Sequence, residues 1–292
     1  MTSTLTSTMV EPELASGPVA EAVADGLIGG RLWFYANYHC NLECTYCLTE
    51  SGPKVRRRIL DTSTMLELAR QARDLGFTDL GVTGGEPFML SSMPDTIEAL
   101  SEILPIVVLS NATLFTGSRL ERVAGFAGRR IHVQVALDAP EAEANDTKRG
   151  ADNWSTVSEA VPALVQRGVA VRLATTAEPG TLSPEAHERL CALHRSWGVP
   201  DDDHVVRPIV ARGRAALDGI GVEAAVGDLP AELCITADGA FWSAFGPTVE
   251  NGRLATDLLI TRTVNPLSVP ANALVRLAGG RPPGSDTTLN IR

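Results

Sequence analysis

Residues 61–87 have the sequence DTSTMLELARQARDLGFTDLGVTGGEP, which contains one helix, one strand and the turn that follows the strand. Asp61 is a typical helix N-cap, and Gly76 is typical of the position where a helix ends. Between them, apolar residues recur at helical spacing, at Met65, Leu68, Ala69, Ala72 and Leu75. The apolar run Asp79–Thr83 then predicts a strand that leads into the turn Gly84–Pro87. This order of helix, strand and turn is the repeating unit of an α/β fold.

The same alternation of strands and helices extends along most of the chain. We expect six strands, at Arg31–Ala36, Asp79–Thr83, Ile106–Ser110, Ile131–Leu137, Val169–Thr175 and His204–Ile209. We expect five helices between them, starting near Asp61, Pro94, Ser118, Asn153 and Pro184. Such alternation requires parallel strands joined by right-handed crossovers, arranged either as an open doubly wound sheet or as a barrel.

The two ends of the chain lack this pattern. Residues 1–28 are rich in Ser, Thr, Ala and Glu without clear periodicity, which predicts a mobile N-terminal arm. Residues 29–215 form the expected main domain. Residues 216–292 contain a predicted β-hairpin around Asp238-Gly239, followed by a stretch rich in Pro and Gly. We interpret them as a small C-terminal extension without a separate core, which covers one end of the main domain.

The amino-acid composition limits the classes of molecule that the protein is expected to bind. The 292 residues carry 25 Lys and Arg against 35 Asp and Glu, a net charge of -10 that disfavours binding to nucleic acid or anionic lipid. No apolar run approaches the ~20 residues of a membrane span, and the start of the chain lacks a signal-peptide pattern. We therefore expect a cytoplasmic protein that binds neither nucleic acid nor membranes.

Three of the five cysteines lie close together. Cys40, Cys44 and Cys47 occur in HCNLECTYC, a C-x3-C-x2-C spacing that lets three thiolates converge on one metal centre. Zinc and iron–sulfur sites usually have four protein ligands, and only His39 is nearby. One interpretation is a zinc knuckle, and the other is a four-iron, four-sulfur (4Fe-4S) cluster with one iron open to a substrate.

The triplet, with the aromatic Tyr46 before its last cysteine, resembles the motif of the radical S-adenosylmethionine (radical SAM) superfamily. The resemblance covers roughly residues 31–215 and implies a partial (β/α)6 TIM-type barrel. It implies that Cys40, Cys44 and Cys47 hold a 4Fe-4S cluster, whose fourth iron is chelated by the amino and carboxylate groups of S-adenosyl-L-methionine (SAM). Reduction of the cluster then cleaves SAM to a 5′-deoxyadenosyl radical, which abstracts hydrogen from a substrate.

The resemblance also implies a set of SAM-binding residues, each just after a predicted strand. Gly84, Gly85, Glu86 and Pro87 match the family's GGEP segment, which receives the SAM amino group. Ser110 and Asn111 resemble its polar pair for ribose or carboxylate, and Arg149 resembles the arginine that binds the methionyl carboxylate. The other candidates, which rest chiefly on their position at strand ends, are Asp138, Thr175 and Arg207.

The two remaining cysteines have different interpretations. Cys191 lies in the middle of a predicted helix and is expected to be a buried small hydrophobe. Cys234 is the only cysteine of the extension, which resembles the start of a SPASM or twitch extension but lacks the cysteines for an auxiliary cluster. We therefore expect a single cluster. A buried strand residue is the simpler interpretation of Cys234, and a hydrogen donor to a substrate radical in a redox-neutral reaction is the alternative.

Partners and substrate are less constrained. The basic run Lys54, Arg56, Arg57 and Arg58 predicts a solvated linker, with a docking site for a flavodoxin- or ferredoxin-type reductant, or for an anionic substrate, as the alternative. The leading functional hypothesis is a radical SAM enzyme acting on a small organic molecule, in specialised metabolite biosynthesis. A peptide-modifying maturase and a non-catalytic zinc-binding module are the competing hypotheses.

Overall fold

The computed structural model describes residues 16–280. Its main sheet has nine strands in the order β11-β8-β7-β1-β2-β3-β4-β5-β6. The first six are β1 (Arg31–Tyr35), β2 (Asp79–Thr83), β3 (Ile106–Ser110), β4 (Ile131–Ala136), β5 (Ala170–Ala177) and β6 (His204–Pro208). Neighbours among these six are all parallel, and the sheet does not close. The expected partial (β/α)6 barrel is therefore confirmed.

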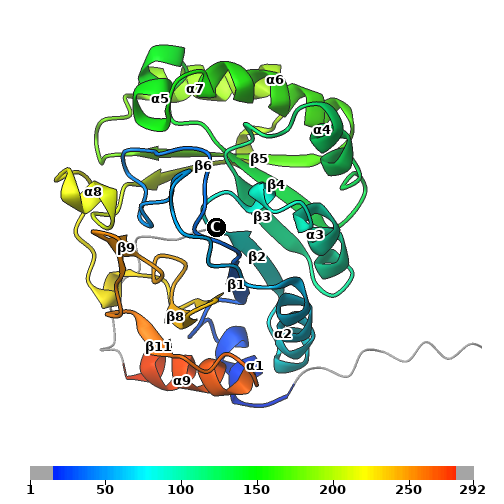
Figure 1. Cartoon of the computed structure of the whole chain (residues 1–292), viewed down its shortest axis with the longest axis vertical. Coiled ribbons are helices and arrows are strands. Elements are labelled where there is room, and N and C mark those ends of the chain that lie inside the picture. The colour runs from blue at the N-terminus through cyan, green and yellow to red at the C-terminus, as the bar shows by residue number, and fades with distance from the viewer. Residues whose placement is uncertain (1–15, 281–292) are drawn as a thin grey trace, which may run out of the picture.

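The helices that connect these strands lie along one side of the sheet, and the loop after β1 lies on the other side (Figure 1). These connecting helices are α2 (Thr62–Leu75), α3 (Met93–Ser101), α4 (Gly117–Ala124), α5 (Ala142–Arg149), α6 (Asn153–Gln166) and α7 (Pro184–Ser196). Helix α1 (Pro18–Ala24) precedes β1, and α8 (Arg214–Leu217) and α9 (Ser268–Gly279) follow β6. Short 3-10 turns occur at Pro87–Met89, Asp201–Asp203 and Val226–Asp228. Within residues 16–280, no helix has the length and apolar character needed to cross a lipid bilayer.

Helix α2 has the N-cap, the terminal glycine and the buried apolar face that its sequence predicts. The Asp61 carboxylate accepts a hydrogen bond from the Thr64 amide at 2.9 Å, which satisfies a free N–H of the first turn. At the other end Gly76 adopts φ 92°, a left-handed conformation that favours glycine. Met65 and Leu68 are buried on the face turned to the sheet.

Two apolar clusters occupy the two faces of the sheet, and β1 contributes to both. Leu32 and Phe34 pack in the large cluster beneath the helices, whereas Trp33 and Tyr35 belong to a smaller cluster on the inner face. This alternation follows from the two-residue period of a strand. Gly81 on β2 makes room for the indole, because a Cβ there would lie 2.2 Å from the Trp33 ring.

The C-terminal extension continues the sheet. Strand β7 (Leu233–Thr236) pairs in parallel with β1, and β8 (Gly239–Trp242) forms the predicted hairpin with β7. Strand β11 (Leu259–Thr261) follows β8, while β9 (Val249–Glu250) and β10 (Arg253–Leu254) form a separate small ribbon. Apolar residues of the extension belong to the same large cluster as those of the barrel. The described part of the extension therefore has no separate core. The domain division at residue 215 stays a prediction.

Four helices were not expected, and one of them, α8, is a short helix of four residues. The predicted mobile arm over residues 1–28 is wrong for its second half, because α1 buries Val19 and Ala22 beside α9 (Figure 1); residues 1–15 lie outside the described residues. Helix α5 was missed because its buried residues, Asn145 and Arg149, are polar. Helix α9 buries Leu274 together with small residues and Pro270, which gives only a weak apolar pattern.

Candidate functional site

A cavity of about 260 Å³ lies at the carboxyl ends of the parallel strands, and the cysteine loop forms part of its wall. Cys40, Cys44 and Cys47 all line it. The loop is held from outside: Arg214 donates to the carbonyl oxygens of Cys44 at 3.1 Å and Ser51 at 2.6 Å. These contacts fix an irregular backbone so that three thiols face one space.

The three thiols suit a metal cluster. All are free, and burial raises the pKa of Cys40 to about 12 and also raises the pKa of Cys44. Thiols in such surroundings become thiolates only when a cation compensates their charge, as a coordinated metal does. Neither Cys191 nor Cys234 lines the cavity, so the local triplet is the set of thiols that could hold a cluster there.

The turn after β2 lies directly against the cysteine loop. The Gly85 amide donates to the Asn37 carbonyl oxygen at 2.8 Å, and the Glu86 amide donates to the His39 carbonyl oxygen at 2.9 Å. A Cβ at Gly85 would lie 2.3 Å from that same His39 oxygen, and Gly84 has φ 146°. The two glycines line the cavity, and they also allow two loops to approach each other closely.

Glu86 and Pro87 do not line the cavity. The Glu86 side chain is fully buried, and its carboxylate accepts from the amides of Phe88 at 3.1 Å and Asn111 at 2.8 Å. The Ser110 hydroxyl donates to it at 3.0 Å. Glu86 therefore fixes the end of β3, where Ser110 and Asn111 line the cavity, instead of facing that space itself.

Arg149 reaches the cavity from the end of α5, and Asp138 holds it there. The guanidinium lies 3.3 Å from the Asp138 carboxylate and also donates to the Tyr46 hydroxyl, which donates to the same carboxylate. Arg149 and Tyr46 line the cavity, whereas Asp138 is buried behind them. The Arg149 Nε atom is buried without a hydrogen-bond partner within residues 16–280. One donor of the guanidinium is therefore available to a ligand.

The pleat of β5 separates two adjacent threonines. Thr176 lines the cavity, and its amide donates to the Asp138 carboxylate at 2.8 Å. The predicted residue, Thr175, points to the opposite face, where its hydroxyl donates to the Leu137 carbonyl oxygen at 2.7 Å. The sequence located the end of β5 but not which threonine faces the cavity, because a shift of one residue along a strand reverses the side-chain direction.

The wall formed by β4 and β6 carries one cation. Arg207 lines the cavity and donates to the Gln134 side-chain oxygen at 3.2 Å. Burial lowers the pKa of Arg207 to about 10, so the guanidinium is still charged at neutral pH. Gln134 was not singled out from the sequence, although its place on an inward-facing strand position could have indicated it.

Cys234 is fully buried in the inner-face apolar cluster, opposite Trp33 in the β1–β7 ladder. Burial raises the pKa of its thiol. Trp33 and Tyr35 line the cavity but Cys234 does not, which favours the packing interpretation over the hydrogen-donor interpretation. From the same extension, Ala244 and Phe245 complete the cavity wall.

Most of the cavity lining was not predicted, because it is apolar. These residues include Trp33, Tyr35, Leu109, Ala136, Ala174, Ile209, Val210 and Phe245. Such side chains look like ordinary core positions in a sequence. The signal that could have found them is their inward phase on strands whose ends carry the polar candidates.

Comparison with known proteins identifies the family. The family model described as the radical SAM superfamily matches residues 36–185. The chain belongs to the radical SAM superfamily. It is an enzyme of that superfamily, whose members use a 4Fe-4S cluster and SAM, and the zinc-binding module proposed as an alternative is thereby disfavoured.

Among curated relatives of this radical SAM enzyme, a GTP 3′,8-cyclase of Syntrophomonas wolfei is 34% identical over 128 residues. The match covers 42% of this chain and 38% of that protein. A probable GTP 3′,8-cyclase of Archaeoglobus fulgidus is 34% identical over 105 residues, 36% of this chain and 34% of that protein. The matched region thus spans little more than a third of these relatives.

Solved structures share the fold. SuiB of Streptococcus suis bound to SAM is 18% identical with a TM-score of 0.52, covering 61% of this chain and 41% of that chain. The structure of native anSMEcpe with bound SAM is 16% identical with a TM-score of 0.51, covering 80% of this chain and 77% of that chain. At such identities the likeness concerns the fold alone.

Proposed function

We propose that the protein cleaves SAM reductively at a single 4Fe-4S cluster held by Cys40, Cys44 and Cys47, and abstracts hydrogen from a small organic molecule. The observation that carries this proposal is that all three thiols line one strand-end cavity. A reduced cluster held by these three cysteines would supply the electron for cleavage of the sulfonium bond of SAM. The protein's own residues bind, orient and enclose the reactants.

Arg149 is the residue we assign to the methionyl carboxylate of SAM. Its Nε atom is a buried donor without a partner in the described part of the chain, and Asp138 fixes the opposite edge of the guanidinium. A guanidinium held in this way binds a carboxylate with little loss of side-chain freedom. Gly84 and Gly85 would place backbone near the amino group, and Asn111 lines the same cavity with its amide held by Asn41 and Thr113. Glu86 and Asp138 act as positioning residues.

Arg207 is the residue we assign to the substrate. It lies among apolar side chains on the β4–β6 wall, where a charged hydrogen-bond donor favours a small molecule with an anionic or carbonyl group. The volume of about 260 Å³ suits small ligands. The names of the two curated relatives give a nucleotide, GTP, as their substrate, which supports a small anionic substrate class.

The electron donor is expected to be a flavodoxin- or ferredoxin-type protein. Lys54, Arg56 and Arg57 are exposed just beyond the cysteine loop, while Arg58 is paired with Asp238 of the β7–β8 turn. An exposed basic run can attract an acidic reductant. We also propose a cytoplasmic location, supported by the five free cysteines, because reducing compartments keep thiols reduced.

The test is anaerobic reconstitution followed by a screen for substrate-dependent release of 5′-deoxyadenosine. About four iron and four sulfide per chain are expected, together with slow SAM cleavage when no substrate is present. Small anions, including nucleotides, should accelerate that release. Stimulation only by peptides would favour a maturase, and stoichiometric zinc in place of iron would overturn the assignment.

Arg207→Gln separates substrate binding from SAM cleavage. We expect at least a tenfold higher KM for the stimulating molecule, because a charged hydrogen bond is worth ~1.5–3 kcal/mol. Substrate-independent SAM cleavage should persist. Arg70→Gln, at an exposed site on α2, is the control for the loss of one positive charge. An unchanged KM in the Arg207 variant would contradict the assignment of the substrate wall.

A further inference from the structure

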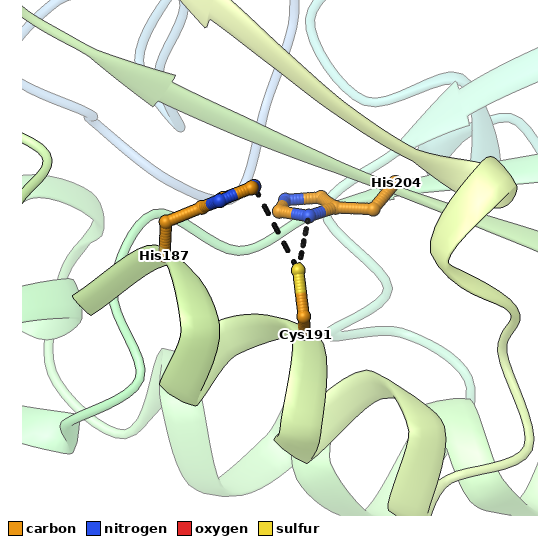
Figure 2. A group of neighbouring side chains, drawn as sticks. All are labelled: His187, Cys191 and His204. Carbon is orange, nitrogen blue, oxygen red and sulfur yellow. Dashed lines mark hydrogen bonds between the residues drawn. The ribbon is translucent and has the colours of Figure 1, made fainter. Parts of the chain in front are cut away.

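A second cluster of ligand-bearing side chains lies between α7 and β6, outside the cavity (Figure 2). His187 and Cys191 lie one turn apart on α7, and His204 is the first residue of β6. One ligand atom from each lies within 4.8 Å of the others. We propose that His187, Cys191 and His204 bind one divalent metal ion of the zinc class, with water completing the coordination.

The distances suit a tetrahedral ion. The Cys191 sulfur lies 3.7 Å from Nε2 of His187 and 3.7 Å from Nδ1 of His204. Zinc bonds of ~2.3 Å to sulfur and ~2.0–2.1 Å to nitrogen place such ligand atoms roughly 3.5 Å apart in a tetrahedron. Both rings point at the thiol (Figure 2). A small closure of the side chains would therefore bring all three within bonding distance of one ion.

The orientation of His204 is fixed from behind. The Thr175 hydroxyl donates its only hydrogen to the Leu137 carbonyl oxygen at 2.7 Å. Thr175 must therefore accept in its 2.9 Å contact with Nε2 of His204, so that Nε2 carries the proton. Nδ1 is left with a lone pair directed at Cys191. Metal-binding histidines are held in this way by a hydrogen bond to the other ring nitrogen.

The site has an entry path and an open coordination position. His187 is exposed, Cys191 is buried and His204 is half-buried, so the ion would reach the site from solvent on the His187 side. Three protein ligands leave a fourth position to water. A thiolate with two imidazoles favours zinc over magnesium or calcium, which prefer oxygen ligands. The positions of α7 and β6 in the fold indicate the role of the bound ion.

Bound metal would join α7 to the open edge of the sheet. Strand β6 is the last strand in the sheet order and pairs only with β5 within the described residues. An ion shared by α7 and His204 adds a link between this edge strand and the helix layer. We therefore assign the site a stabilising role, independent of SAM cleavage, so that it can be tested whether or not the proposed function holds.

The first experiment measures zinc in the enzyme with its cluster loaded, so that Cys40, Cys44 and Cys47 are already occupied by iron. We expect one zinc per chain after desalting. X-ray absorption at the zinc edge should show one sulfur and three nitrogen or oxygen neighbours, and zinc should raise the Tm. Absence of bound zinc, or a shell of three sulfurs indicating zinc at the triplet, would overturn the proposal.

The second experiment removes ligands singly. His187→Ala changes an exposed side chain, so its folding should be unaffected, and Cys191→Ser preserves size. Each should weaken zinc binding by ~100-fold or more, because loss of an outer-shell contact alone typically costs 10–100-fold. Thr175→Val should weaken it by ~10-fold through His204. His132→Gln, on β4, is the matched histidine control. Equal zinc affinity in the wild type and His187→Ala would refute the site.

Discussion

The chain gathers thiol and imidazole groups in two regions, and the two regions are built in opposite ways. The triplet sits on an irregular loop whose shape depends on remote contacts, such as those from Arg214 to Cys44 and Ser51. The His187–Cys191–His204 cluster stands on a regular helix and the start of a strand. Ligands that are close in sequence need a scaffold to point them inward, whereas ligands on rigid elements are oriented by the packing of those elements.

The largest expected effect is the loss of the cluster when one triplet cysteine is replaced, with no effect on the other region. Cys44→Ala should abolish both cluster iron and 5′-deoxyadenosine formation, because two thiolates cannot retain a cluster whose fourth iron has no protein ligand. Cys191→Ala should keep the full iron content and lose only zinc. Iron and zinc analysis of both variants after anaerobic reconstitution checks this. Loss of iron from Cys191→Ala would mean that the two regions are not independent.

The same contrast explains what the sequence could predict. The triplet could be predicted because its three cysteines lie within one short segment. The strand bounds could be predicted to within about two residues, because buried parallel strands are continuous apolar runs. The second cluster has no sequence signature, because His204 follows Cys191 only after the helix has ended and the chain has turned back. Its members converge through the packing of α7 on β6.

Residue roles were harder to predict than residue positions. Glu86 and Asp138 were expected to contact SAM, but both are buried behind the cavity and hold Asn111 and Arg149. Thr175 was expected in the cavity, but it faces His204 and Thr176 lines the cavity instead. A sequence locates the end of a strand, whereas the direction of each side chain depends on a phase that changes with every residue.

Arg149→Ala should cost about 3–5 kcal/mol of unfolding free energy, measured in urea, because the buried Asp138 carboxylate loses its only cationic partner among the described residues and keeps only its neutral donors. SAM binding should weaken by roughly tenfold or more. Arg149→Lys keeps the charge but loses the planar fork, so it should lose less stability. Zinc binding at the His187–Cys191–His204 cluster should not change in either variant. A loss of zinc would show coupling between the regions.

Glu232 should make the protein less stable as the pH rises. Burial raises the pKa of this carboxyl to about 7, and it accepts a hydrogen bond from the Trp33 indole at 2.7 Å. Between its unfolded pKa and about 7 the folded state binds the extra proton, so stability falls by up to ~1.4 kcal/mol per pH unit. Glu232→Gln keeps the acceptor and should flatten this limb of the unfolding profile. An unaltered slope would contradict the assignment.

His194 should give the stability of the protein the opposite pH dependence. Burial lowers the pKa of this imidazole to about 3, and within residues 16–280 neither ring nitrogen has a hydrogen-bond partner. Below about pH 6.5 the imidazole is protonated in the unfolded state but stays neutral in the folded state. The free energy of unfolding therefore falls on acidification and is ~2 kcal/mol lower at pH 5 than at neutral pH. His194→Leu should remove this loss in zinc-free protein, as measured by urea unfolding at pH 5 and pH 8. Equal acid sensitivity in both proteins would place the effect elsewhere.

The smallest expected effect concerns the exposed run that follows the triplet loop. Replacing Lys54, Arg56 and Arg57 by Ala should slow SAM cleavage by roughly three- to tenfold when an acidic flavodoxin-type protein is the reductant, because the basic charges accelerate encounter. Adding salt should reduce the difference, since exposed charges are screened over ~10 Å at 0.1 M. With dithionite, the variant and wild type should react equally, which separates docking from damage to the loop. An equal loss with both reductants would instead assign the run to the support of the cysteine loop. Replacement of Arg70 and Arg73 on α2 and Arg122 on α4 by Ala removes the same three charges elsewhere and provides the control for net charge.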